Sequence, residues 1–277
     1  MGQTSDRRYE TFFGIILLIT AISFFISPGY SAYAGEDGTR LQQIKEAGKI
    51  VAGTSADYPP YEFHLLNDKE GELVGIDIDI AKVIAEELGV KLEVKDIIFS
   101  RIFDALDDGQ IDIAIAGLHP NEERKKRADF SDIYYMAIQT IVIRAEQADL
   151  IKTVEDLRGK TVGVQKDTIQ EGMARSHIEG ASFVVRETIE ELIINLEKGL
   201  VDALILEKPV AESYVNRNKH FAIVQCKKFV DKLGSAIAVK KFNTELLAEI
   251  NRILKKLKDE NKIEEFVENA KMLTNKQ

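Results

Sequence analysis

The sequence predicts an α/β protein made of two units, each a mostly parallel β-sheet flanked by helices. The first observation is that short apolar strand patterns alternate with amphipathic helix patterns, which is typical of βαβ units. The second is that this alternation occurs twice, over residues 49–117 and again over residues 152–226. The third is the length of 277 residues, which is sufficient for two domains.

The first unit begins with a polar helix pattern at residues 39–48, followed by a strand at 49–54. The strand leads into "SADYPPYEF", where two prolines forbid a helix and predict an extended, exposed turn. An amphipathic helix comes next, with Asp77 expected to cap its beginning and Gly89 to end it. The remaining elements are expected at 91–97 (strand), 100–109 (helix) and 111–117 (strand).

The second unit repeats this order of elements. The chain is expected to cross between the units near residues 142–146 and again near 232–236. Ligands bind beyond the carboxyl ends of the strands in open α/β sheets, so two facing edges would form a cleft that closes by a hinge motion. The expected elements are short helix 152–158, strand 161–165, helix 188–199, strand 201–207, helix 208–218, strands 222–226 and 232–241, and two helices over 244–273.

Composition describes an ordinary globular protein, with 45% hydrophobic and 30% charged residues. The formal net charge is −9, and the basic residues are scattered along the chain. Binding to nucleic acid requires a basic surface that neutralises phosphates, so nucleic acid is not expected as a partner.

The N-terminus has the layout of a secretory signal peptide. Arg7 and Arg8 precede the apolar run "FFGIILLITAISFFI", and the small residues of "AYA" end at Ala34. We therefore expect residues 1–34 to be a signal peptide, cleaved before Gly35, and the mature protein to lie in the periplasm. The alternative is an uncleaved membrane tether, because the run is only slightly shorter than a bilayer span.

Cys226 is the only cysteine of the sequence, so an intrachain disulfide is excluded. No cysteine follows the apolar run, and an N-terminal lipoprotein anchor is therefore not expected. Export without disulfides suggests a bacterial periplasmic protein that its apolar cores stabilise.

The sequence resembles the polar amino-acid solute-binding proteins of ABC importers. The resemblance implies a type II periplasmic-binding-protein fold, with two lobes joined by two hinge strands and no catalytic activity. It places residues 35–142 and 236–277 in lobe 1 and residues 143–235 in lobe 2. The segments that carry it are "GTSADYPPYEF", "GIDIDIAKVIAEELG", "AGLHPNEERKKRADFSDIYY", and "DLRGKTVGVQKDT" followed by "VDALILEKP".

In this family the first unit supplies the residue that grips the ligand's α-carboxylate, and the resemblance identifies it as Arg124. A guanidinium matches a carboxylate with two parallel hydrogen bonds, which a lysine does not do. Its neighbours Lys125, Lys126 and Arg127 are expected to face solvent. A charge run such as "EERKKR" is usually a solvated helix face, so Arg124 is the exception here.

From the second unit, the resemblance implies that Thr168 contacts the same carboxylate from a helix N-terminus, with Gln165 close by. Asp167 stands where a small residue is common, which leaves the backbone of this loop uncertain. Glu207 matches the acid that receives the ligand's α-ammonium, although aspartate is commoner there. A helix N-terminal charge is the alternative role for Glu207.

Further ligand contacts are implied for Tyr58 and Phe99, which fall where the family places aromatic rings around the ligand's side chain. Gly117 and His119 lie where backbone groups contact the ligand, although a structural role for His119 is equally open. Ser55 occupies a position where some relatives carry an acid, and this weakens, without excluding, a cationic ligand side chain.

The expected partners are an L-amino acid, polar or basic, and the membrane permease of an ABC importer. Arginine, glutamine, histidine and cystine remain open, and a monomer without cofactor or metal is expected, because the histidines lack ligand-like spacing. Two alternatives remain: an enzyme resembling cyclohexadienyl dehydratases, and a membrane-tethered amino-acid sensor.

Overall fold

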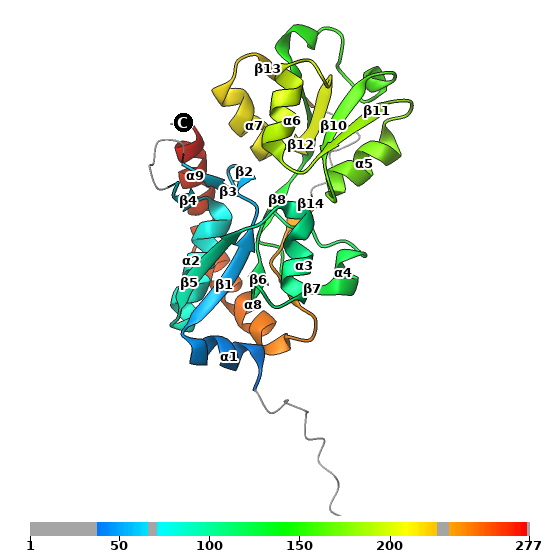
Figure 1. Ribbon diagram of the computed structural model, residues 1–277. Helices are drawn as coiled ribbons and strands as arrows, with labels where there is room; N and C mark the ends of the chain where they lie inside the picture. The colour runs from blue at the N-terminus through cyan, green and yellow to red at the C-terminus, as the bar shows by residue number, and fades with distance from the viewer. Residues whose placement is uncertain (1–37, 66–70, 226–232, 276–277) are drawn as a thin grey trace, which may run out of the picture. The chain divides into compact units, whose positions relative to one another are not determined.

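The computed structural model describes residues 38–65, 71–225 and 233–275. The predicted signal peptide and Cys226 lie outside the described residues. Figure 1 shows an α/β fold, as predicted, with two five-stranded sheets. The first sheet has the order β5 (Lys91–Asp96), β1 (Lys49–Thr54), β6 (Ile113–Ala114), β15 (Ala238–Lys240) and β7 (Ala128–Phe130). The second has the order β11 (Ser182–Arg186), β10 (Thr161–Gln165), β12 (Ala203–Glu207), β9 (Gln139–Arg144) and β13 (Phe221–Val224).

The two sheets have the same pattern of strand directions. In the first, β1 pairs in parallel with β5 and β6, while β15 is antiparallel to both β6 and β7. In the second, β10 pairs in parallel with β11 and β12, while β9 is antiparallel to β12 and β13. Each sheet is therefore mixed in its pairing, although only its fourth strand opposes the others in direction.

Smaller ladders complete the described strands. One contains β2 (Asp57–Tyr58), β3 (Glu62–His64) and β4 (Leu73–Val74), and the other pairs β8 (Tyr135–Ala137) with β14 (Leu233–Ser235). The chain passes from the first sheet through β8 into β9, and it returns through β14 into β15. Sheet membership changes at Gln139, three residues before the end of the predicted lobe 1 at residue 142, because β9 pairs wholly within the second sheet.

Helices cover both faces of each sheet. Ile50 and Ala52 of β1 belong to the core that includes α2, α8 and α9, whereas Val51 packs in the core that includes α3. This alternation follows from the two-residue period of a strand. In the second sheet, α6 and α7 pack with Leu204, and α5 packs on the other face with Ile205.

The bounds of the helices follow from local capping in several places. Thr39 and Thr188 form capping boxes at the starts of α1 and α6. The helices are α1 (Arg40–Ala47), α2 (Ile76–Leu88), α3 (Ile102–Asp107), α4 (Arg124–Arg127), α5 (Ile169–His177), α6 (Ile189–Glu197), α7 (Lys208–Arg217), α8 (Thr244–Asp259) and α9 (Lys262–Thr274), with short 3₁₀ turns at Phe99–Arg101, Ala145–Gln147 and Glu155–Leu157.

Two local expectations were wrong. Asp77 does not cap α2: Gly75 holds the N-cap position, and the Asp77 carboxylate instead accepts hydrogen bonds from Gly117 N and Tyr134 Oη. The proline-rich turn is not exposed, because Pro59, Pro60 and Tyr61 are buried. The end of α2 at Gly89, with a left-handed backbone, is as predicted.

Candidate ligand-binding site

A pocket lies beyond the carboxyl ends of β1, β6, β10 and β12, the edge at which open α/β sheets bind ligands. About 350 Å³ inside it is not filled by protein atoms. The volume that the centre of a water molecule can reach is only about 20 Å³. Its walls therefore lie close together. The lining residues are Ser55, Asp57, Tyr58, Glu62, Phe99, Ala116, Gly117, His119, Arg124, Gln165, Thr168, Ile169, Gln170 and Glu207.

Every residue that the sequence analysis assigned to the site lies in this lining. The structure thus brings together residues that are spread from Ser55 to Glu207. Their roles toward a ligand remain predictions. Sequence reasoning missed Asp57, Glu62 and Gln170, the other polar members of the lining.

Arg124 begins the short helix α4 and is 8% exposed. The backbone N–H of Arg124 donates a hydrogen bond to Asn121 Oδ1 at 2.8 Å, which fixes the start of this turn. Its guanidinium donates to the carbonyl oxygens of His119 at 2.9 Å and Asp167 at 3.0 Å, and the Phe99 ring lies 5.2 Å from its central carbon. Burial lowers the pKa of Arg124 to about 10, so the side chain remains a cation at neutral pH.

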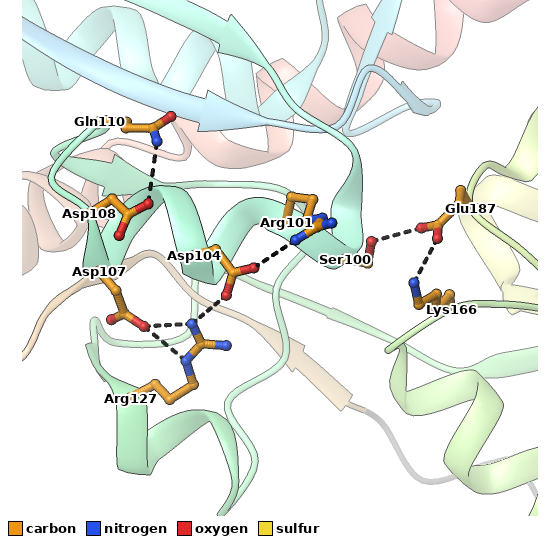
Figure 2. Close-up of polar contacts among 9 residues, drawn as sticks. All are labelled: Ser100, Arg101, Asp104, Asp107, Asp108, Gln110, Arg127, Lys166 and Glu187. Carbon is orange, nitrogen blue, oxygen red and sulfur yellow. Dashed lines mark hydrogen bonds and ion pairs between the residues drawn. The ribbon is translucent and has the colours of Figure 1, made fainter.

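The neighbours of Arg124 are exposed, as predicted. Lys125, Lys126 and Arg127 all point away from the pocket lining. Figure 2 shows Arg127 bound to Asp104, at 2.8 Å, and to Asp107 on α3. The charge run is therefore a solvated face with one buried member.

Thr168 is the N-cap of α5, the position expected from the sequence. Its hydroxyl accepts from Glu171 N and donates to the carbonyl oxygen of Gln165 at 2.7 Å. Gln165 ends β10, and its amide nitrogen donates to the carbonyl oxygen of Glu187 at 3.0 Å. Asp167, between them, has a φ of 59°, a left-handed backbone that aspartate tolerates better than most residues.

Glu207 ends β12 and is 2% exposed. It holds the N-cap position of α7 but makes no capping bond with its side chain. Instead, Tyr61 Oη donates to Glu207 Oε2 at 2.5 Å. Burial raises the pKa of Glu207 to about 7, against the opposing effect of the tyrosine hydrogen bond, so this carboxyl group titrates near neutral pH.

Two further carboxyl groups enter the pocket from the β2–β3 hairpin. Asp57 Oδ2 accepts from the N–H of Ile189, the first residue of α6, at 2.6 Å, and Asp57 Oδ1 accepts from Ser55 Oγ at 3.3 Å. Burial, partly offset by that N–H, raises the pKa of Asp57 to about 6. The side chain of Glu62 is fully buried, and within the described parts of the chain its carboxylate oxygens receive no hydrogen-bond donor.

Both predicted aromatic residues line the pocket. Tyr58 stacks on Tyr61, with ring centroids 5.5 Å apart, and Phe99 lies against the guanidinium of Arg124. Gly117 has a φ of 54°, and a β-carbon there would approach the Tyr58 ring to 3.2 Å. The left-handed backbone therefore favours glycine at this point, and a β-carbon would crowd the Tyr58 ring.

The backbone carbonyl of His119 accepts a hydrogen bond from Arg124, and a hydrogen bond of its ring holds the residue in place. Its Nδ1 hydrogen bonds to the carbonyl oxygen of Gly234 in β14 at 3.0 Å, which places the ring proton on that nitrogen. Burial, followed by the nearby charge of Arg124, lowers the pKa of His119. Gln170 joins the two walls, since its amide nitrogen donates to Gln139 Oε1 at 2.9 Å and lies 3.3 Å from Tyr58 Oη.

Across residues 38–65, 71–225 and 233–275, no group of His, Cys, Asp and Glu side chains is arranged to hold a metal ion. In the same ranges no helix has the length and apolar character needed to cross a bilayer.

The site thus combines one buried guanidinium with two buried carboxyl groups and one half-buried carboxyl group between two α/β sheets. The family model described as "Bacterial extracellular solute-binding proteins, family 3" matches residues 50–270. Among curated proteins, the chain is 35% identical to the arginine-binding extracellular protein ArtP of Bacillus subtilis, over 91% of this chain and 94% of the relative. It is 33% identical to the glutamine-binding protein GlnH of the same organism, over 91% of each chain.

Solved structures agree with this match. An amino-acid ABC transporter substrate-binding protein of Streptococcus pneumoniae, bound to L-arginine, superposes with a TM-score of 0.82 at 34% identity, covering 85% of this chain and 100% of that one. An ancestral amino-acid-binding protein, a precursor of cyclohexadienyl dehydratase, has a TM-score of 0.77 at 34% identity, over 84% and 99% of the two chains. The fold is the predicted two-lobed type II periplasmic-binding-protein fold, and the chain belongs to the bacterial extracellular solute-binding proteins of family 3.

Proposed function

We propose that this protein captures an L-amino acid with a cationic side chain, L-arginine above all, and delivers it to the permease of an ABC importer. One observation carries the choice of a cationic side chain. The pocket holds the buried carboxyl groups of Glu62 and Glu207 and the half-buried one of Asp57, against the single guanidinium of Arg124. Asp57 already accepts a hydrogen bond from the Ile189 N–H, so a ligand with two cationic groups and one carboxylate matches Glu207, Glu62 and Arg124. A neutral side chain leaves Glu62 without a partner.

The ligand's α-carboxylate binds Arg124 in this proposal. The guanidinium already donates to two carbonyl oxygens, His119 O and Asp167 O, which hold its plane in place. Thr168, at the N-terminus of α5, supports the same carboxylate. The ligand's α-ammonium binds Glu207, whose carboxylate Tyr61 already orients.

The side chain of the ligand passes between Tyr58 and Phe99 toward Glu62. The unsatisfied Glu62 carboxyl group supplies the acceptor that a guanidinium requires. The arginine named in the descriptions of ArtP and of the pneumococcal structure supports this assignment.

Capture requires the two lobes to separate and close. The pocket leaves only about 20 Å³ for the centre of a water molecule, too little for an amino acid to enter without movement of its walls. The β8–β14 ladder, through which the chain passes in both directions, is the hinge in this proposal. We propose lobe limits close to those expected from sequence, with the first crossing moved to residue 138 so that β9 stays whole.

The proposal makes the protein a carrier without catalysis. Its relatives include a protein described as a precursor of cyclohexadienyl dehydratase, so prephenate and arogenate belong in every ligand panel as tests for an enzyme. The proposal also places the mature chain in the periplasm as a monomer, after cleavage at residue 34. The mass of the exported protein distinguishes cleavage from a membrane tether.

The test is a thermal-shift panel on the exported protein, unfolded and refolded to remove bound ligand. L-arginine, L-lysine and L-ornithine are compared with L-glutamine and L-citrulline, the last having nearly the shape of arginine without its charge. Ligand at a hundred times its dissociation constant adds about 2.7 kcal/mol, which for a chain of this size raises Tm by roughly 5–10 °C. We expect this rise with arginine and a much smaller one with citrulline.

A matched variant tests directly whether the charge of Glu62 selects a cationic ligand. Glu62→Gln keeps the shape of the side chain and removes its charge, so arginine should bind at least about tenfold more weakly, while citrulline changes little. Glu264→Gln, at an exposed position on α9, is the control. Equal shifts with arginine and citrulline in the unmodified protein would contradict the proposal.

A further inference from the structure

Glu62 is buried in a way that an ionised carboxylate does not tolerate. Tyr61, Glu62 and Phe63 are consecutive residues that are at most 3% exposed. Neither carboxylate oxygen of Glu62 accepts a hydrogen bond from the described residues, although the side chain lines the ligand pocket. A buried charge without a partner costs several kcal/mol, so such a group is expected to hold a proton instead.

The backbone places Asp77 beside Glu62. Asp77 N donates to the carbonyl oxygen of Tyr61 at 2.9 Å, so the start of α2 is joined to β3 immediately before Glu62. The Asp77 carboxylate has the opposite environment: Gly117 N donates to it at 2.8 Å, and Tyr134 Oη lies 2.8 Å from both of its oxygens. With such donors, Asp77 is the member of the pair that carries the negative charge.

The other titratable groups near Glu62 do not supply a cation. They are Asp57 on β2 and Glu207 on β12, together with the phenols of Tyr58 and Tyr134. Arg124, on α4, is the cation of the same lining, and its guanidinium is turned to the carbonyl oxygens of His119 and Asp167. Among the described residues, no Lys or Arg forms an ion pair with Glu62. Glu62 can still form a hydrogen bond by donating its own proton to Asp77.

We propose that Glu62 and Asp77 share one proton in the ligand-free pocket, and that the cationic group of a bound ligand expels this proton. The inference rests on the proposed function, because it is the ligand's side-chain cation that replaces the proton. In the exchange the O–H bond of Glu62 breaks, the proton passes to the solvent, and the Glu62 carboxylate pairs with the ligand. Asp77 is then a positioning residue, which touches no ligand and sets the protonation of Glu62.

The titration behaviour of the pair agrees with this geometry. Burial, followed by the charge of Asp77, raises the pKa of Glu62 well above its ordinary value. Burial also raises the pKa of Asp77 to about 6, where the donors Gly117, Tyr134 and Glu62 limit the rise. At neutral pH the proton therefore resides on Glu62.

The test is calorimetric titration of the refolded protein with L-arginine at pH 7, in buffers with different enthalpies of ionisation. The dependence of the heat on the buffer counts the protons released. Glu207 releases part of a proton to any α-ammonium, so the informative quantity is a difference. We expect the unmodified protein to release about one proton more than Glu62→Gln, which has no carboxyl proton to lose. It should also release more than Asp77→Asn, in which an amide N–H replaces the acceptor and favours the ionised form of Glu62 before the ligand arrives.

Infrared spectroscopy of ligand-free samples gives a second measurement that does not require the variants to bind. The unmodified protein should show the C=O stretch of buried protonated carboxyl groups at pH 7, and Glu62→Gln should show a weaker band, because only the contribution of Glu207 remains. Addition of arginine to the unmodified protein should remove the same band.

The outcomes separate this inference from the proposed function. Arginine that binds with the same proton release in the unmodified protein and in Asp77→Asn, with no change in the carboxyl band, overturns the shared proton and leaves the proposed function intact. If arginine gives no binding heat, the proposed function is overturned. The exchange of the shared proton for the arginine side chain is then overturned with it.

Discussion

The guanidinium of Arg124 donates to the main-chain oxygen of Asp167 at 3.0 Å, and Asp167 presents that oxygen from a left-handed backbone with φ of 59°. The contact joins α4, which lies between β6 and β7 of the first sheet, to the loop between β10 of the second sheet and α5. In the described residues Arg124 has carbonyl partners but no carboxylate partner. Its positive charge is therefore held in position without being neutralised.

Removal of Arg124 should abolish ligand binding and spare the fold. Arg124→Ala loses a charge-assisted contact of about 1.5–3 kcal/mol, a weakening of at least about tenfold. Thermal stability without ligand should be equal or higher, because a buried cation without a carboxylate partner has been removed. Arg124→Lys is the companion variant, since a lysine retains the charge but cannot form the two parallel hydrogen bonds of a guanidinium. Binding as tight as in the unmodified protein would refute the carboxylate assignment.

The sequence was sufficient to identify Arg124 as the buried member of its charge run, because the family likeness selected one arginine and composition assigned its neighbours to solvent. Sequence also placed Glu207, which ends the predicted strand 201–207, and Thr168, three residues after the predicted strand 161–165, in the pocket lining. Strand ends are well defined by sequence pattern, and the edge they share is a property of the fold.

Residues of the β2–β3 hairpin were missed for a different reason. Glu62 lies in "PPYEF", where two prolines suggested an exposed turn, yet the hairpin packs into the core and buries the glutamate. The available signal was an acid between Tyr61 and Phe63, since a charge inside an aromatic run is unusual for a solvated turn. Asp57 and Gln170 gave no such signal, because each is joined to a residue more than 100 positions away, Asp57 to Ile189 and Gln170 to Tyr58. Such contacts exist only once both sheets have formed.

Stability of the ligand-free protein should fall as pH rises from about 5 to about 8. The folded-state pKa is about 7 for Glu207 and about 6 for Asp57 and Asp77, above their ordinary values near 4. In that window the folded protein binds more protons than the unfolded chain, so each rise in pH favours unfolding. Exposed acids with lowered pKa values affect stability below this pH range, because their protonation on acidification destabilises the folded protein.

Thermal unfolding of refolded, ligand-free protein across this range measures the effect. Glu207→Gln should flatten the dependence between pH 6 and pH 8, because its neutral amide does not titrate. Glu264→Gln, an exposed control, should leave the slope unchanged. A Tm that rises through the window in the unmodified protein would contradict the assigned burial of these acids.

Gly75 should tolerate no side chain. It has a φ of 131°, and a β-carbon there would lie 2.2 Å from the carbonyl oxygen of Tyr61. Gly75→Ala should therefore destabilise by about 3 kcal/mol or more, through strain together with a clash against backbone. Gly89→Ala is the matched control: Gly89 has a φ of 70° but open space around it, so only the left-handed strain of about 1–2 kcal/mol is expected. Denaturant unfolding of the two variants should separate them clearly, and equal losses would contradict the steric account.

Ser100 should slow ligand release without touching the ligand. Figure 2 shows its hydroxyl bound to Glu187 Oε2, at 2.7 Å, while Lys166 holds the other oxygen of Glu187, also at 2.7 Å. Ser100 follows β5 of the first sheet and Glu187 follows β11 of the second, and neither lines the ligand pocket. The bond therefore forms only when the two sheets are close.

Ser100→Ala removes this bond alone and leaves the ion pair of Lys166 with Glu187 in place. Because a ligand leaves only when the lobes separate, we expect faster dissociation, by at most about fivefold for a contact so open to solvent, with an unchanged association rate. Stopped-flow tyrosine fluorescence after mixing ligand-free protein with ligand at several concentrations measures both rates. Ser176→Ala, whose hydroxyl binds carbonyl oxygens of its own helix, is the control. A slower association with unchanged dissociation would show that Ser100 acts on entry of the ligand and not on the closed state.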